Sequence, residues 1–274
     1  MKLKSSRFTL LGVVAAASLA FALVGAAPAG ATTGGGGPFT CGDGSLPGGT
    51  YSSVTVTGSC TVDSGNVTVT GDVVVASPFG TLIAAFGGSD LVVGGRMLVQ
   101  SGGALVLGCE ASAFPCLNDD PHNPTMETND RIGGNLNSQD ALAVLVHHNI
   151  IGGQVIQNGG GGGPSCRPRT RLLGSPAYAT YEDNVIHGNV SITDWKSCWM
   201  GFFRNSSTSV EYLRNATLDP DGNEMATNTI NGGLRCSGNA PAPQIGDSGG
   251  SLNVVTGRVG GGQCEDIVQP PPAS

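Results

Sequence analysis

The densest group of carboxylates in the sequence surrounds a glycine turn, Asp219-Pro220-Asp221-Gly222-Asn223-Glu224. Hard cations such as Ca²⁺ prefer carboxylate and carbonyl oxygens, so Asp219, Asp221 and Glu224 form a candidate calcium site. The segment lacks the spacing of an EF-hand loop, and an ordinary acidic turn explains the same residues. We therefore expect no cofactor, with calcium as the one candidate.

Aromatic side chains gather in one segment of a chain in which only 5% of residues are aromatic. Trp195, Trp199 and Tyr212 lie in this segment together with two phenylalanines. Flat rings stack on sugar faces or mediate protein contacts, so an exposed cluster would make these three residues a ligand-binding surface. The alternative is a satellite core under a loop held by Cys198.

The histidines give a weaker signal. His147 and His148 are adjacent, so on a strand they would point to opposite faces and could not both line one site. His187 occupies a variable position of the repeat described below, so we expect it to face solvent. We predict no histidine metal site.

The first 31 residues have the parts of a secretory signal peptide. Three cations precede an apolar stretch over residues 8–24, and Ala29-Gly30-Ala31 supplies small residues for cleavage. We predict a signal peptide over residues 1–31 and a secreted, extracellular protein. A retained membrane anchor is the alternative, but the stretch is short for a spanning helix.

Removing the three cations changes the net charge from −7 to −10 (−7 − 3). A field of that sign repels nucleic acid and anionic lipid. We therefore expect neither nucleic acid nor, after signal cleavage, a membrane as a partner.

All eight cysteines follow the predicted signal peptide, and an even count in an exported chain indicates disulfides. A zinc site is the competing interpretation, but the chain has no C-x-x-C motif. We favour pairing between sequence neighbours: Cys41 with Cys60, Cys109 with Cys116, Cys166 with Cys198, and Cys236 with Cys264.

A short repeat organises the chain: apolar residue, any residue, Gly, any residue, apolar residue. In its longer copies Asn149–Val155 aligns with Asn184–Val190, and Asn228–Leu234 and Asn253–Val259 follow the same template. Asp130–Leu136 begins with Asp instead of Asn. If each copy is one turn of a stacked structure, the apolar residues stack and the inward Asn side chains form an amide ladder.

Alternation of β-branched and polar residues, as in Val67–Val75, favours strands over helices. The repeat resembles that of pectate-lyase-like proteins over residues 50–268. This resemblance implies an all-β fold, a right-handed parallel β-helix (solenoid) with disulfide-tied loop insertions. An antiparallel β-sandwich is the competing fold. The end of the chain, from Asn228 to Cys264, also resembles secreted actinobacterial proteins that have no known activity.

The chain is expected to form one β-helix domain over residues 41–268. A flexible Gly-rich leader over 32–40 precedes it, and a Pro-rich tail over 269–274 follows it. We expect loop excursions at residues 109–130, 159–183 and 198–227.

Pectate-lyase-like enzymes use a basic residue beside carboxylates that hold calcium, and the related polygalacturonases use several aspartates and a Gly-His-Gly. The chain has fragments of these motifs, but their order and completeness differ. If the protein is an enzyme, the resemblance implies that its catalytic residues are Asp119, Asp120, Arg131, His187 and Lys196.

Gly246-Asp247-Ser248-Gly249-Gly250 resembles the sequence around the nucleophile of chymotrypsin-like serine proteases. A nucleophilic serine needs a histidine base, and the Ala-Ala-His-Cys neighbourhood of that family is absent from the chain. We interpret the pentapeptide as a turn between strands.

We therefore expect a secreted protein without catalytic activity, acting as an extracellular or cell-surface structural or binding module. Its expected partner is an extracellular polysaccharide or cell-wall component, which makes it a candidate carbohydrate-binding protein. The alternative is a polysaccharide lyase or glycoside hydrolase, which requires the candidate residues to converge in one groove. Self-association is a third expectation, because exposed edge strands pair with other chains.

Overall fold

The computed structural model describes residues 34–169, 172 and 174–270. The predicted signal peptide and the end of the predicted tail lie outside the described residues. The described chain is all-β with almost no helix; η2 (Glu265–Ile267) is a short 3₁₀ helix near its end. No helix in this part of the chain is long and apolar enough to cross a membrane.

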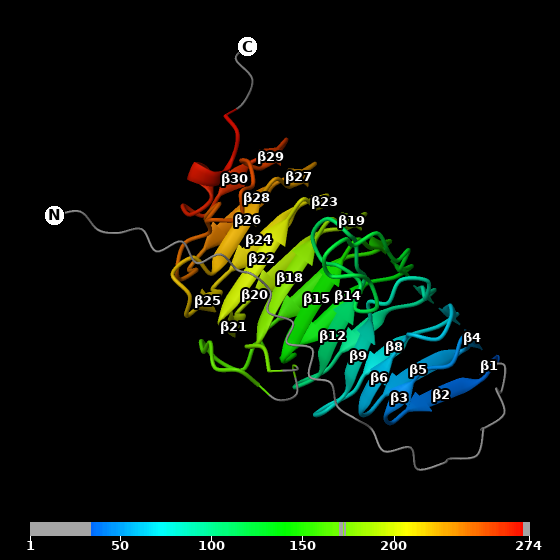
Figure 1. The fold of residues 1–274 in the computed structure, drawn as a ribbon. Helices are drawn as coiled ribbons and strands as arrows, with labels where there is room; N and C mark the ends of the chain where they lie inside the picture. The colour runs from blue at the N-terminus through cyan, green and yellow to red at the C-terminus, as the bar shows by residue number, and fades with distance from the viewer. Residues whose placement is uncertain (1–33, 170–171, 173, 271–274) are drawn as a thin grey trace. The chain divides into compact units, whose positions relative to one another are not determined.

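Three parallel sheets contain most of the strands (Figure 1). Sheet A consists of β1 (Gly34–Gly35), β4 (Gly49–Tyr51), β7 (Val67–Val69), β10 (Leu91–Val93), β13 (Arg131–Ile132), β16 (Ile150–Ile151), β19 (Val185–Ile186), β23 (Ser206–Ser207), β27 (Thr229–Ile230) and β29 (Val254–Val255). Sheet B consists of β2 (Pro38–Cys41), β5 (Ser53–Val56), β8 (Val73–Val75), β11 (Met97–Val99), β14 (Leu136–Gln139), β17 (Val155–Asn158), β20 (Val190–Thr193), β24 (Val210–Leu213), β28 (Leu234–Ser237) and β30 (Val259–Gly260).

Sheet C is shorter, and a separate strand pair accompanies it. Sheet C consists of β3 (Gly44–Ser45), β6 (Ser59–Thr61), β9 (Thr81–Ala84), β12 (Ala104–Leu107), β15 (Ala143–His147), β18 (Tyr178–Glu182), β22 (Trp199–Phe203) and β26 (Asn223–Ala226). The pair is formed by β21 (Lys196–Ser197) and β25 (Ala216–Thr217).

The chain visits sheets A, B and C in turn, so that each strand pairs in parallel with the strand of the next circuit. A parallel pair needs a crossover connection, and here the other two sheets provide it. This topology is consistent with a β-helix-like fold and disagrees with an antiparallel β-sandwich. The segment expected to be a flexible leader contains strand β1 and most of strand β2. Pro38–Cys41 pairs with β5 and so extends sheet B by one strand.

The repeat follows from packing. Val73, Met97 and Leu136 are register partners in sheet B, and all three are buried in one apolar core. The repeat glycine lies at a close approach between successive circuits. A Cβ at Gly134 would lie 2.7 Å from the carbonyl oxygen of Gly95, which is closer than real Cβ contacts allow. Glycine is therefore required where one circuit passes over the previous one.

The predicted amide ladder is present. The backbone N–H and the side-chain Nδ2 of Asn184 both donate to Oδ1 of Asn205, at 3.1 and 2.9 Å. The same pattern continues along the core through Asn205, Asn228 and Asn253. These buried amides are satisfied by one another, which removes most of the desolvation penalty of placing them in the core.

The residues before Asn149, Asn184 and Asn205 adopt a left-handed conformation, with φ of 57° at His148, 56° at Asp183 and 52° at Arg204. This turns the chain sharply from the end of sheet C into sheet A. Because the turn recurs in successive circuits, the side chains of these three residues occupy equivalent positions along one corner of the fold.

Four disulfides join sequence neighbours: Cys41–Cys60, Cys109–Cys116, Cys166–Cys198 and Cys236–Cys264. These are the pairs favoured from the sequence. Disulfides of this number suit an oxidising compartment.

Candidate functional site

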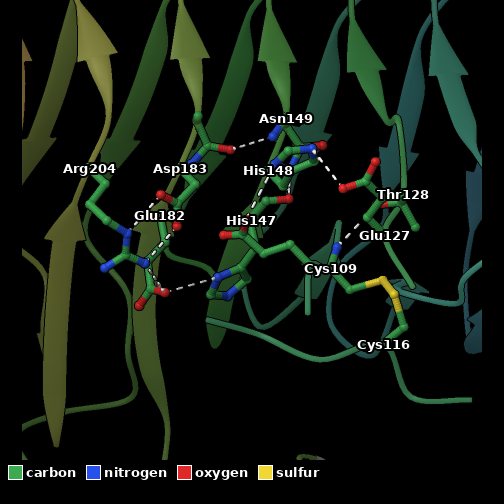
Figure 2. A network of polar contacts seen from close by, with 12 residues as sticks. Cys109, Cys116, Glu127, Thr128, His147, His148, Asn149, Glu182, Asp183 and Arg204 are labelled. Atoms are coloured by element: carbon green, nitrogen blue, oxygen red, sulfur yellow. Dashed lines mark hydrogen bonds and ion pairs between the residues drawn. A yellow bond between two sulfur atoms is a disulfide. The ribbon is translucent and has the colours of Figure 1, made fainter. Parts of the chain in front are cut away.

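The largest group of interacting titratable side chains lies where sheet C turns into sheet A (Figure 2). His147 and Glu182 are register partners at the ends of β15 and β18. Asp183 and Arg204 follow in left-handed turns of consecutive circuits. We call these four residues, together with Glu110 from the loop after β12, the covered corner.

Arg204 organises the covered corner. Its Nε donates to Asp183 Oδ1 at 2.7 Å, and its Nη2 donates to Asp183 Oδ2 at 2.6 Å and to Glu182 Oε2 at 3.3 Å. His147 Nδ1 lies 3.5 Å from Glu182 Oε2. Burial opposes the charge on Asp183, but the hydrogen bonds from Arg204 outweigh it and hold the pKa of Asp183 below its ordinary value.

The loop over residues 108–130 covers this corner. The Phe114 ring stacks on the His147 imidazole with ring centroids 4.0 Å apart and planes 5° apart. His147 is almost fully buried, and neither of its ring nitrogens has a hydrogen-bond partner. The Cys109–Cys116 disulfide closes the loop around Phe114, and the Cys109 N–H donates to Thr128 Oγ1 at 3.0 Å (Figure 2).

Glu110 brings one more carboxyl group to the corner. Burial, together with the adjacent Asp183, raises its pKa to about 7. Its Oε1 is buried without a hydrogen bond, and its Oε2 lies 3.6 Å from His148 Nδ1. The corner therefore holds a carboxyl group that exchanges a proton near neutral pH beside carboxylates that stay ionised, an arrangement found in acid–base sites.

The expectation that His147 and His148 cannot share a site is wrong. Strand alternation ends at His147, because His148 turns with φ of 57°. Both side chains then reach the same network, His147 through Glu182 and His148 through Glu110. Sequence reasoning missed Glu110, Glu182, Asp183 and Arg204. Asp183 and Arg204 directly precede the repeat asparagines Asn184 and Asn205, and this shared position is the signal that could have found these two residues.

A second cluster combines two of the three predicted calcium ligands with an unexpected residue. Ligand oxygens of Asp221, Glu224 and Asp247 lie within 4.8 Å of one another. Asp219 instead accepts the N–H of Asp221 at 3.1 Å. Burial, together with the neighbouring aspartates, raises the pKa of Glu224 to about 7. Oxygen ligands of this kind suit Ca²⁺.

Asp247 comes from the protease-like pentapeptide. That segment is an exposed turn between β28 and β29, as the sequence suggested, in which Ser248 Oγ donates to the carbonyl of Ile245 at 2.7 Å. The local sequence around Glu224 does not indicate that Asp247 lies nearby, because the two residues come together only through the stacking of successive circuits.

The predicted aromatic surface is divided between core and exterior. Trp195 and Tyr212 are fully buried, with Trp195 Nε1 donating to Ser197 and the Tyr212 hydroxyl to Asn223. These two residues therefore belong to the core. Trp199 alone of the three reaches the surface, where it is half-buried.

Trp199 belongs to a row of rings on the outer face of sheet C, which we call the aromatic row: Tyr178, Trp199 and Phe203. The ring centroids of Trp199 and Phe203 lie 5.7 Å apart, and those of Tyr178 and Trp199 lie 6.3 Å apart. Gly201 lies between the two rings of β22, and a Cβ there would meet both. Trp199 Nε1 donates to Glu224 Oε1 at 3.0 Å, so the row adjoins the acidic cluster.

The five candidate catalytic residues lie in four separate places of the fold. Asp119 and Asp120 shape the loop after β12, where Asp119 accepts the N–H groups of Thr125 and Met126. The Asp120 N–H donates to Asp119 Oδ1 at 2.8 Å within this loop, and among the residues that the structure describes no other hydrogen bond or ion pair joins any two of the five. The other three are exposed: Arg131 on β13, His187 after β19 and Lys196 on β21.

Neither protein-family models, nor curated proteins, nor solved structures provide a match to this chain. A fold hosts many functions, so any function must come from the surfaces described above.

Proposed function

We propose that the protein is a secreted, right-handed parallel β-helix that acts as an extracellular or cell-surface binding and structural module without catalytic activity. Its proposed partner is an extracellular polysaccharide or cell-wall component. The cyclic order of parallel strands supports the β-helix assignment. The four disulfides and the signal-peptide pattern of residues 1–31 support export.

The aromatic row is the observation that carries the binding proposal. The half-buried rings of Tyr178 and Trp199, with the buried Phe203 packed against Trp199, offer apolar faces on which sugar rings stack. The hydrogen bond from Trp199 Nε1 to Glu224 fixes the indole, so little side-chain entropy is lost on binding. The carboxylates of Asp221 and Asp247 lie next to Glu224 and can accept sugar hydroxyl groups.

Retardation in native gels that contain single polysaccharides tests this proposal. The wild-type protein should be retarded by at least one polysaccharide and should release no reducing or unsaturated ends from it. Trp199→Ala should lose about tenfold in affinity. Phe79→Ala, which removes an exposed ring elsewhere, should not. Equal retardation of both variants, or retardation by none of the polysaccharides, would refute the binding proposal.

The covered corner favours polysaccharide lyase or glycoside hydrolase activity as the second candidate, because Glu110 has a pKa of about 7 beside the ionised Asp183. A general acid or base works best when its pKa lies near the working pH. This alternative predicts release of reducing or unsaturated ends that Glu110→Gln abolishes. A protein that retains a polysaccharide but never cleaves it would eliminate the alternative.

A further inference from the structure

The surface of sheet B is hollowed at its last strands. A groove of about 400 Å³ is lined by residues that include Glu211, Arg235, Arg258 and Gly260. Glu211, Arg235 and Gly260 are register partners on β24, β28 and β30. A Cβ at Gly260 would meet nothing within 4 Å, so the missing side chain leaves open space beside Arg235. The groove has the size of small-molecule sites.

The arginines of this groove are available to a ligand, unlike others in the chain. Arg96, Arg204 and Arg214 each donate to an aspartate from Nη2 at 2.6–2.7 Å. Arg235 Nη1 lies 3.7 Å from Glu211 Oε1, and both side chains are more than half exposed. Such an exposed ion pair contributes little free energy, so Glu211 holds Arg235 only weakly. The Arg258 guanidinium makes no hydrogen bond or ion pair with any residue that the structure describes.

We infer that this groove binds an oxyanion group, a carboxylate or a phosphate, through Arg258 and Arg235. The planar guanidinium offers paired N–H donors that match two oxygens of either anion. Two available guanidinium groups at one groove stand out in a chain whose net charge is −7. The groove lies on sheet B, whereas the aromatic row lies on sheet C, so this inference does not depend on the proposed polysaccharide surface.

Glu211 sets the strength of the site. Its carboxylate competes with the ligand for Arg235, because the two side chains already lie within ion-pair distance. Removing this acidic charge should therefore strengthen binding of the oxyanion. Filling the hollow at Gly260 should abolish binding without changing any charge.

The side-chain Nε–Hε NMR signals of the arginines provide the test. The full-length protein is titrated with sodium phosphate and, separately, with sodium glucuronate, and sodium chloride at equal ionic strength is the reference. The signals of Arg235 and Arg258 should shift and saturate with one or both oxyanions, and the stronger of the two identifies the ligand group. The Arg96 signal should follow ionic strength alone, because Asp72 already holds Arg96.

Five variants complete the test. Arg258→Ala should weaken binding about tenfold, as expected for loss of a charge-assisted pair. Gly260→Leu should abolish saturation and Glu211→Gln should tighten binding several-fold, whereas Arg96→Ala should change nothing. Shifts that track ionic strength equally at all three arginines, or binding that survives both Arg258→Ala and Gly260→Leu, would overturn the inference. The aromatic-row variant Trp199→Ala should bind the oxyanion normally, so the failure of either proposal can be recognised separately.

Discussion

Two corners of this fold carry the same ion pair in different surroundings. In the covered corner Asp183 and Arg204 turn with φ of 56° and 52°, and in an open corner Asp194 and Arg214 turn with φ of 58° and 57°. In both, the arginine donates from Nε and Nη2 to the aspartate of the previous circuit. The backbone turns and the Arg–Asp hydrogen bonds are the same in the two corners. Any difference in how much the two ion pairs stabilise the fold therefore comes from the residues around them.

The neighbours differ greatly. The open pair is largely solvated, with 41% of the Asp194 side chain and 58% of the Arg214 side chain exposed. The corresponding fractions in the covered pair are 20% and 40%, and Glu110 and Glu182 add two more carboxyl groups. Lower solvent access strengthens each interaction there and raises the free-energy cost of breaking it. The comparison shows that one loop converts a surface ion pair into part of a titrating cluster.

The largest expected effect comes from removing the arginine of the covered pair. Arg204→Ala leaves Glu182 and Asp183 without their counter-charge and should lower the free energy of unfolding by about 2 kcal/mol, below the about 3–5 kcal/mol of a fully buried pair because Arg204 is partly solvated. Arg214→Ala is the matched control and should leave the melting temperature unchanged within error. Thermal unfolding of both at pH 6.5 provides the measurement, and equal losses would abolish the distinction between the corners.

A smaller effect is expected from replacing Asp130, the last residue of the loop over residues 108–130. Asp130 occupies the ladder position that is asparagine in later circuits, and burial raises its pKa to about 7. The folded state therefore binds more protons than the unfolded state between about pH 4 and pH 7, so stability falls as pH rises through that window.

Asp130→Asn supplies a neutral amide and should raise the free energy of unfolding at pH 8 by about 1 kcal/mol, with a smaller gain at pH 5. Denaturant unfolding at the two pH values measures the difference. A variant that is less stable than wild type at pH 8 would show that the aspartate is held there by a favourable charge.

The smallest effect is expected from replacing Glu110, which lies in the loop over residues 108–130. Glu110 has a pKa of about 7, raised from 4.5 by burial and Asp183, so it too contributes stability that is lost as pH rises from about 4.5 to about 7. Glu110→Gln should remove that part of the pH dependence and exceed wild type at pH 8 by less than about 1 kcal/mol, because the buried side-chain oxygen still lacks a hydrogen-bond partner.

The slope that Asp130 and Glu224 produce should remain in Glu110→Gln, since the pKa of each is also about 7. The informative quantity is therefore the difference between the two unfolding curves as a function of pH. A difference that does not vary with pH would remove Glu110 from the titrating cluster.

The sequence predicts what repeats in the chain. Period-two alternation predicted strands, and the resemblance of the repeat to that of pectate-lyase-like proteins implied that they are parallel. The recurring Asn149, Asn184, Asn228 and Asn253 predicted the amide ladder, and the even cysteine count predicted the disulfides. These features depend on local pattern or on stacking of like residues, so a single chain is enough to find them.

Contacts between unlike residues of different circuits could not be predicted in the same way. Asp247 meets Glu224, and Glu110 meets Asp183, only because the turns place them side by side. The sequence groups Trp195 with Trp199 in one candidate cluster because the two are close in sequence, yet Trp195 is buried in the core and Trp199 is half-buried at the surface. The left-handed turn at Asp194 lies directly before Trp195, and strand alternation does not reveal its direction.

The account depends most on the aromatic row as a polysaccharide-binding surface, and a calorimetric titration of three proteins tests it most directly. Wild type, Trp199→Phe and Trp199→Ala are titrated with an oligosaccharide of a polysaccharide that retards the wild type. We predict that the phenylalanine variant keeps most of the affinity, because it retains a ring, and that the alanine variant loses about tenfold with its fold intact. Equal affinity in all three proteins would contradict the account.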